Sequence, residues 1–353
     1  MNKKTLKLDK HNISFSNKPF LVAEISGNHK GSLKRVLSIV EAAANAGFDA
    51  IKLQTYTADT ITLDTKSKDF LIKDSKSLWK NRYLHDLYKE AYTPWHWHKI
   101  IFSKAKNLGL SYFSTPFDET AVDFLETLNV PFYKISSFEN NHFPLIKKVI
   151  ETKKPLIIST GATTISELDV IYKFLINNKC RDFCFLKCVS NYPSKIKDYN
   201  LLSIPMLMKR YSAHVGLSDH TIGHVAATSS IVLGARIIEK HVTYKNNDGA
   251  IDSKFSLEVK NFKEFINYCQ DSYKSLGKKY YNISKSEKKS LIFKRSIFFI
   301  NNLDKGKKVS SNDIKIVRPN LGLNPIFWYK ILGKKILKKA KKNTPTKLNY
   351  FYK

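Results

Sequence analysis

The sequence predicts an α/β protein built on a (β/α)8 TIM barrel, followed by a small β-rich C-terminal domain. Short apolar runs with β-branched residues alternate with longer amphipathic stretches over residues 20–276, which is typical of βα units around a parallel sheet. Eight such pairs can be counted, the number that closes a barrel. After residue 277 the chain turns polar and lysine-rich and then returns to strand-like runs, which indicates a separate domain.

The predicted barrel elements follow one another in strict alternation. The strands span residues 20–26, 49–55, 111–117, 132–138, 155–160, 183–190, 214–220 and 236–243. The helices span about 33–46, 94–109, 118–128, 143–152, 165–178, 200–211, 223–234 and 260–276. The connection 56–92 is abnormally long, and long loops at the C-terminal rim of a barrel usually carry function. We therefore expect it to shape a substrate pocket.

Three segments are expected in the chain as a whole. A barrel domain occupies residues 1–277, a linker 278–294 and the β-rich domain 295–353. Residues 1–20 build no apolar leader, and no run approaches the roughly 20 apolar residues of a membrane-spanning helix. We expect a cytoplasmic protein without a membrane partner, whose four cysteines stay reduced and pack as small buried side chains.

The charge is the unusual feature of the composition. The chain has 60 Lys and Arg against 30 Asp and Glu, a net charge of +30. Such an excess can indicate nucleic acid, an anionic membrane or anionic substrates. The lysines are spread over nearly every predicted helix with a mild concentration in the tail, and no aromatic-basic RNA-binding pattern is present. We favour solvated lysines and no nucleic-acid partner; a basic nucleic-acid-binding protein on a non-catalytic barrel is the alternative from another class.

Polar residues end most of the predicted strands, where the active sites of β/α barrels lie. Lys52, Lys134 and Lys187 each fall within a strand, and burying a lysine is costly unless an anion accompanies it. Each lysine alone is better explained by an ion pair at the rim, but the set of three calls for a dianion such as phosphate. Hydroxyl groups from several strands would complete its cradle: Thr115, Ser137, Ser159, Ser190 and Ser218.

Two histidines, His220 and His241, end neighbouring predicted strands. Their imidazoles can meet at one metal ion, with a carboxylate or water completing an open site. Two histidines with oxygen ligands suit Mn²⁺ or a similar ion better than structural Zn²⁺. The pair therefore predicts a divalent metal site at the rim.

Seven motifs in this order resemble those of the sialic acid synthase family: AEISGNHKGS, IKLQTYT, STPFD, YKISSFE, ISTGATT, GLSDHT and EKHVT. The resemblance covers residues 20–276. The segment that follows is similar to the small antifreeze-like (SAF) domain that closes this family: KRSIFFINNLDKGKKVSSNDIKIVRPNLGLNP.

The resemblance implies that phosphoenolpyruvate reacts with an N-acetylated amino sugar, with Mn²⁺, Mg²⁺ or Co²⁺, in a domain-swapped homodimer. It implies that His220 and His241 bind the metal. Around phosphoenolpyruvate it implies Lys52, Thr115, Lys134, Ser137, Ser159, Ser190 and Ser218. On the sugar side it implies Gln54, Glu139, Tyr192, Asp252 and Arg295, the last donated to the partner subunit's sugar pocket.

One segment, LWKNRYLHDLYKEAYTPWHWH, resembles the pseudaminic acid synthase branch of this family. That resemblance implies 2,4-diacetamido-2,4,6-trideoxy-altrose as the aldehyde; synthesis of N-acetylneuraminate from N-acetylmannosamine, or of legionaminic acid from its counterpart sugar, is the alternative. Synthases of seven- or eight-carbon sugar acids share the chemistry, but the SAF-like tail argues against them. The family's usual Gly-Pro-Asp reads Gly249-Ala250-Ile251-Asp252 here.

The expected reaction needs a carboxylate that takes a proton from water. The metal would polarise the aldehyde as a Lewis acid, carbon 3 of phosphoenolpyruvate would attack it, and water would capture carbon 2 before phosphate leaves. Glu24, Glu139 and Asp219 are the candidates for the base.

Overall fold

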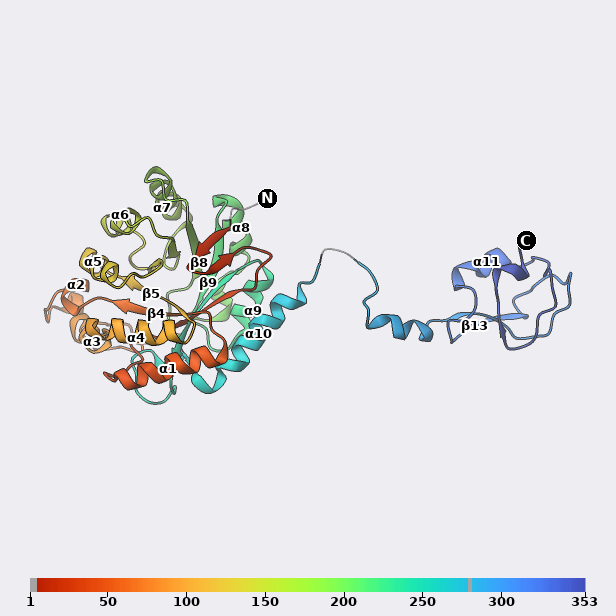
Figure 1. The fold of residues 1–353 in the computed structure, drawn as a ribbon, viewed down its shortest axis with the longest axis horizontal. Coiled ribbons are helices and arrows are strands. Elements are labelled where there is room, and N and C mark those ends of the chain that lie inside the picture. The colour runs from red at the N-terminus through yellow and green to blue at the C-terminus, as the bar shows by residue number, and fades with distance from the viewer. Residues whose placement is uncertain (1–4, 279–280, 353) are drawn as a thin grey trace. The chain divides into compact units, whose positions relative to one another are not determined.

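Eight parallel strands form a closed barrel in the computed structural model, which describes residues 5–278 and 281–352 (Figure 1). They are β3 Phe20–Glu24, β4 Ala50–Thr55, β5 Ser111–Pro116, β6 Tyr133–Ile135, β7 Leu156–Ser159, β8 Phe183–Cys188, β9 His214–Asp219 and β10 Ile237–Thr243. Each pairs in parallel with the next, and β10 pairs with both β9 and β3, so the sheet closes on itself. The predicted barrel is confirmed.

A helix follows each barrel strand and covers the outside of the sheet (Figure 1). These helices are α1 Leu33–Ala46, α4 Trp95–Asn107, α5 Glu119–Thr127, α6 Phe143–Glu151, α7 Ile165–Asn177, α8 Ser203–Tyr211, α9 Val225–Val232 and α10 Phe262–Ser275. Local signals set several starts: Asp118 accepts hydrogen bonds from the first turn of α5, and Thr164 and Glu167 form a capping box on α7. No helix among the described residues is long and apolar enough to cross a membrane.

The barrel has two apolar layers, because successive side chains of a strand point to opposite faces. Outward side chains pack against the helices, and inward ones such as Phe113, Phe132 and Leu186 fill the barrel. An antiparallel hairpin, β1 Leu6–Leu8 and β2 His11–Ile13, adds apolar side chains to the inner layer. All four cysteines are buried, as expected.

The long connection after β4 contains its own structure. It holds α2 Ala58–Ile61, a 3-10 turn at Lys68–Phe70, a bridge between Leu71 and Tyr83, and α3 Leu84–Ala91. The sequence predicts only a long connection here and none of these elements. Their contacts keep the segment in place beside the strand ends.

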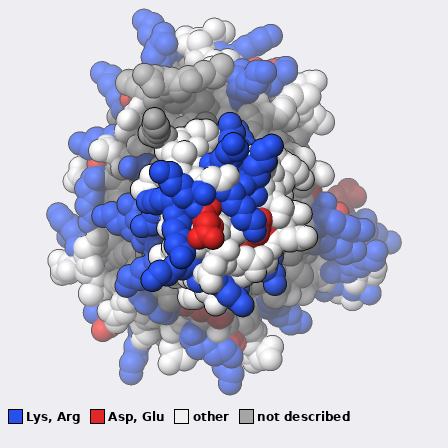
Figure 2. Space-filling model, turned by 90° about the vertical axis from the view of Figure 1, so that its right-hand side faces the viewer, with Lys and Arg blue, Asp and Glu red and all other residues white. Residues whose placement is uncertain are grey.

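A second compact unit begins at Lys278. Its sheet has three antiparallel strands in the order β13 Ile314–Val317, β12 Ser296–Phe299 and β14 Thr344–Pro345, next to α11 Trp328–Ile331. A 3-10 helix, Glu287–Phe293, lies within the expected linker. Residues 278–353 carry 21 Lys and Arg against three Asp and Glu, and the face in Figure 2 shows many basic side chains around few acidic ones. The positive charge is therefore more concentrated here than scattered lysines predict.

Candidate active site

A cavity of about 400 Å³ opens at the carboxyl ends of the barrel strands. One part of its wall is polar and comes from the strands, and the other is apolar and comes mainly from the connection after β4. Eleven of the predicted site residues line it: Lys52, Gln54, Lys134, Ser137, Glu139, Ser159, Tyr192, Ser218, His220, His241 and Asp252. Four others in the barrel do not: Glu24, Thr115, Ser190 and Asp219. The remaining one, Arg295, belongs to the second unit.

Two buried lysines and two buried glutamates form an ion-pair cluster at the polar end of the cavity. Lys52 Nζ lies 3.1 Å from Glu24 Oε2 and 2.9 Å from Glu239 Oε1. Lys134 Nζ lies 2.8 Å from both carboxylate oxygens of Glu239. The lysines expected to hold a phosphate are thus already desolvated and paired with carboxylates.

The pKa values in this cluster follow from burial and the short ion pairs. Burial opposes charge on Lys52, but Glu239 and Glu24 outweigh it and raise the pKa of its ammonium group. Burial lowers the pKa of Lys134 to about 8 and raises that of Glu24 to about 7. Burial also opposes ionisation of Glu239, yet the two lysines hold the pKa of its carboxyl well below the usual range. Because burial raises the pKa of Glu24, the two glutamates together carry less than two full negative charges near neutral pH, which favours an anion beside the two lysines.

Glu239 is the functional candidate that sequence reasoning did not single out. It lies on β10 two residues before His241, so both side chains point into the barrel. The spacing of two residues from His241, a predicted site residue, was the signal in the sequence that could have identified Glu239. Lys240 between them points outward and pairs with Asp219.

Hydroxyl groups surround the lysines as expected. Ser137, Ser159 and Ser218 line the cavity, and Ser218 Oγ donates to Glu239 Oε1 at 3.1 Å. Gly161 lies against Ser137 and Ser190, and a Cβ added to it would come within 2.7 Å of Ser137 Oγ. The glycine therefore permits this close approach.

Two imidazoles lie side by side at the edge of the lysine cluster. The ring centroids of His220 and His241 are 5.1 Å apart. His220 Nδ1 lies 2.9 Å from the carbonyl oxygen of Val189, to which it can donate, leaving Nε2 as the acceptor nitrogen. Burial, reinforced by His220, keeps the pKa of His241 well below its usual value, and the neutral imidazole is the form that binds metals.

The donor atoms fit a divalent ion with an open coordination sphere. His241 Nδ1 is buried without a hydrogen-bond partner, and Asp252 Oδ2 lies 3.9 Å away from it. Residues 5–278 and 281–352 contain no group of three His, Cys, Asp or Glu side chains placed to hold a metal. Water and substrate oxygens would therefore have to supply the other ligands, as the weak, oxygen-rich sites of Mn²⁺ and Mg²⁺ allow.

Cys188 is buried as predicted, but it also lines the cavity. Its Sγ lies 3.9 Å from His220 Nδ1. Cys184 shares the inward face of β8, as the spacing of four residues predicts.

The residues expected on the sugar side form a second polar group. Gln54 Nε2 donates to Glu24 Oε1 at 3.0 Å and to Ser26 Oγ at 3.1 Å, and Ser26 also donates to Asp252. The ring of Tyr192 lies 4.4 Å from that of His220. Burial raises the pKa of Glu139 to about 7. These side chains connect the imidazoles to the rest of the cavity.

Asp219 and Lys187 do not reach the cavity, contrary to the expectation from their places at strand ends. Asp219 points outward from β9, and its carboxylate accepts hydrogen bonds from Lys240 Nζ at 2.8 Å and from the backbone and hydroxyl of Thr221. Lys187 is half-buried on the outward face of β8, between inward Leu186 and Cys188. The alternation of side chains excludes both, so the expected set of three lysines reduces to two.

The other predicted residues that do not line the cavity differ in position. Glu24 lies beneath Lys52, Thr115 is a buried inward side chain of β5 whose hydroxyl lacks a partner, and Ser190 is half-buried near Cys188. Arg295 belongs to the second unit, where it is exposed directly before β12.

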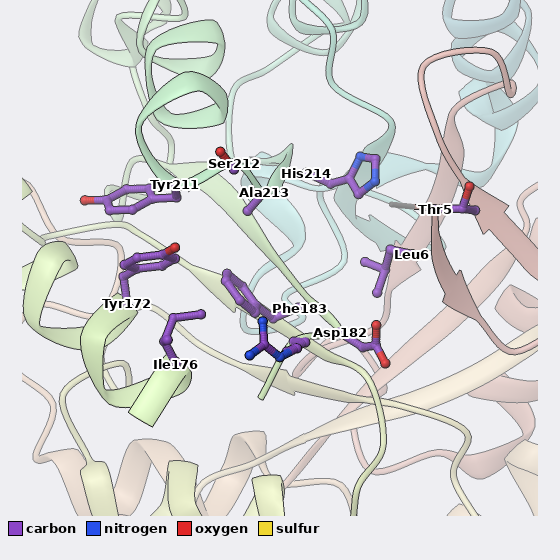
Figure 3. A pocket seen from close by; sticks show the side chains of 11 residues that line it. Thr5, Leu6, Tyr172, Ile176, Asp182, Phe183, Tyr211, Ser212, Ala213 and His214 are labelled. Carbon is purple, nitrogen blue, oxygen red and sulfur yellow. The ribbon is translucent and has the colours of Figure 1, made fainter. Parts of the chain in front are cut away.

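A smaller cavity of about 190 Å³ lies at the opposite ends of the strands, where β8 and β9 begin (Figure 3). The rings of Tyr172 and Tyr211, 4.9 Å apart, and of Phe183 line it. It shares no lining residue with the cavity that holds the lysines and imidazoles.

A closed β/α barrel whose strand ends bring paired lysines, hydroxyls and two adjacent imidazoles into one cavity has the features of an enzyme active site. The NeuB family model matches residues 39–281. This chain belongs to the NeuB family.

Characterised relatives cover almost the whole chain. It is 41% identical over 330 residues to the pseudaminic acid synthase of Campylobacter jejuni, covering 94% of this chain and 96% of the relative. It is 41% identical over 328 residues to the pseudaminic acid synthase of Helicobacter pylori, covering 93% and 96%. Among solved structures, an N-acetylneuraminic acid synthetase from Leptospira borgpetersenii in complex with citrate matches with a TM-score of 0.72 and 26% identity, covering 82% of this chain and 95% of that one.

Proposed function

We propose that this chain condenses phosphoenolpyruvate with 2,4-diacetamido-2,4,6-trideoxy-altrose to give pseudaminic acid, a nine-carbon sialic-acid-type sugar, and phosphate. The observation that carries the proposal is one cavity in which the Lys52 and Lys134 cluster lies beside the imidazoles of His220 and His241. The pseudaminic acid synthases that match nearly the full chain support this choice of sugar.

The residues divide the reaction between two ends of the polar wall. Lys52 and Lys134 hold the phosphate of phosphoenolpyruvate, with hydroxyl groups of Ser137, Ser159 and Ser218 around it. A divalent ion on His220 and His241, when bound, would supply Lewis-acid polarisation of the aldehyde. Carbon 3 of phosphoenolpyruvate then attacks the aldehyde carbon, whose oxygen takes up a proton.

Water completes the reaction at carbon 2 of the former phosphoenolpyruvate. Positive character develops there, water adds, and the resulting hemiketal phosphate loses phosphate by C–O cleavage. A carboxylate that removes the proton from water works best with a pKa near the working pH. Glu139 lines the cavity with a pKa of about 7, so we assign it this role; Glu24, also at about 7, is beneath Lys52 and orients it.

The sugar side is completed by the small domain in this proposal. Arg295 is exposed immediately before β12, and a guanidinium there can reach the sugar pocket of a second subunit in a domain-swapped homodimer. Gln54, Tyr192 and Asp252 meet the sugar from the barrel.

Phosphate release tests the proposal. Purified protein with Mn²⁺ and phosphoenolpyruvate is given the trideoxy diacetamido sugar, its legionaminic counterpart or N-acetylmannosamine. We expect release with the first, loss of release after chelation and recovery with added Mn²⁺. If no sugar leads to phosphate release, the proposed enzymatic activity is wrong. If kcat/KM for N-acetylmannosamine equals that for the trideoxy diacetamido sugar, the proposed choice of sugar is wrong. A salt-titrated DNA-binding measurement in parallel tests the nucleic-acid alternative.

A further inference from the structure

The apolar wall of the cavity comes mainly from one segment of the chain. Residues 56–91 contribute eight side chains to it, and none of them is charged. Tyr56 and Tyr88 bring the only hydroxyl groups among these eight, and Ile61, Ile72 and Leu84 are half-buried apolar side chains that face the cavity. A hydroxyl group of a ligand would find few partners on this wall.

Contacts of a histidine with two aspartates and backbone hydrogen bonds hold the wall in place. His85 at the start of α3 lies with Nε2 2.9 Å from Asp59 in α2 and Nδ1 3.5 Å from Asp64. Ile72 exchanges backbone hydrogen bonds with the 81–82 turn at 2.9 and 3.0 Å. The apolar side chains are therefore presented in fixed positions before a ligand arrives.

Trp79 joins this wall to the polar side of the cavity. Its indole N–H donates to the carbonyl oxygen of Ile251 at 3.1 Å, next to Asp252. The centroid of its ring lies 5.6 Å from that of the Tyr192 ring, which in turn packs against the His220 ring. A sugar whose aldehyde met the imidazoles would therefore extend its remote carbons toward Trp79 and the other side chains of the apolar wall.

Resting on the proposed function, we propose that Ile61, Ile72, Trp79 and Leu84 form a specificity subsite for the end of the sugar remote from the aldehyde. The subsite selects a methyl group at carbon 6 over a hydroxymethyl group. A hydroxyl there loses its hydrogen bonds to water without a replacement, whereas a methyl group gains contact with apolar side chains. The substrate class is thus a 6-deoxy hexose.

Serine variants of two wall residues test the subsite. For Ile72→Ser and Leu84→Ser we measure kcat and KM with the trideoxy diacetamido sugar and with N-acetylmannosamine. Each variant should reduce the preference for the deoxy sugar about tenfold, mostly through the sugar KM, since a hydrophobic pocket discriminates one such group by roughly 10- to 100-fold. The KM for phosphoenolpyruvate should stay within about twofold, because neither residue is near the lysines.

Matched variants separate specificity from general damage. Leu63 is on the same segment but is 67% exposed and does not line the cavity, so Leu63→Ser should leave the preference unchanged. Ile72→Leu should keep it, because volume and apolar character are retained. If a serine variant fails to fold, Ile72→Thr replaces it with a smaller change in volume.

The two proposals fail in different ways. Wild-type protein that releases no phosphate with the deoxy sugar contradicts the proposed function. Wild-type protein that is active, with an unchanged ratio of kcat/KM in folded Ile72 and Leu84 variants, contradicts the subsite alone.

Discussion

At the scale of single residues, Glu239 organises the polar end of the cavity. It joins Lys52 of β4 and Lys134 of β6, which lie on strands that do not neighbour its own. Such a contact across a barrel depends on closure of the sheet, so the sequence could identify the two lysines but not their shared carboxylate. Asp219 and Lys187 were expected at the cavity but point away from it, because one step along a strand turns a side chain to the other face.

The imidazole pair gives the first prediction. His220→Ala and His241→Ala should each lower kcat by at least about a thousandfold, because each removes one of the two histidines that we propose as metal ligands. Mn²⁺ binding without substrate, followed by calorimetry, should weaken in both variants. Near-normal turnover with unchanged Mn²⁺ binding in either variant would contradict the metal proposal.

A pH profile tests the base. Burial raises the pKa of Glu139 to about 7, and a base must be ionised to accept a proton, so kcat should fall as the pH drops below about 7. Glu139→Gln should lower kcat roughly a hundredfold or more and remove that limb of the profile. If the acidic side of the pH profile is unchanged in this variant, Glu139 is not the base, and Glu24, whose pKa is also about 7, becomes the candidate.

At the scale of elements, the strands and helices of the barrel were predictable because apolar periodicity and turn residues set them locally. The structure inside residues 56–92 was not, because α2 and α3 are short and are held by contacts such as those of His85 with Asp59 and Asp64. Closure of the barrel also depends on the small residue Gly216 in β9, where the chain approaches β10 and Leu186 of β8.

Gly216→Ala should therefore lower stability rather than chemistry. An added Cβ would lie 2.6 Å from Leu186 Cδ2 and 2.9 Å from Ile237 Cβ, as well as against the Ile237 carbonyl oxygen. Because backbone on β10 cannot yield easily, we expect about 1–3 kcal/mol lower free energy of unfolding, measured by urea denaturation. A decrease in the free energy of unfolding below about 0.5 kcal/mol would show that β8 and β10 can move apart to accommodate the added Cβ, contrary to this expectation.

At the scale of the whole molecule, the chain has two compact units: a barrel that contains the cavity and a small basic domain that contains Arg295. The sequence predicted both parts, since the change of composition near residue 278 is visible in the letters alone. The expected mild concentration of lysines in the tail understates the charge of this part, because residues 278–353 hold 21 of the 60 Lys and Arg and only three of the 30 acidic residues.

The proposed homodimer gives the last prediction. Arg295→Ala should raise the sugar KM roughly tenfold or more, with little change in the KM for phosphoenolpyruvate, because a charged hydrogen bond to the sugar is lost. If the arginine acts on the partner subunit, mixing Arg295→Ala protein with His241→Ala protein after dissociation and reassociation should restore about a quarter of wild-type activity. Half of the dimers would then be mixed, each with one intact barrel that receives an intact arginine. Unmixed variants assayed side by side are the control, and a mixture no more active than their average would show that Arg295 serves its own barrel or none.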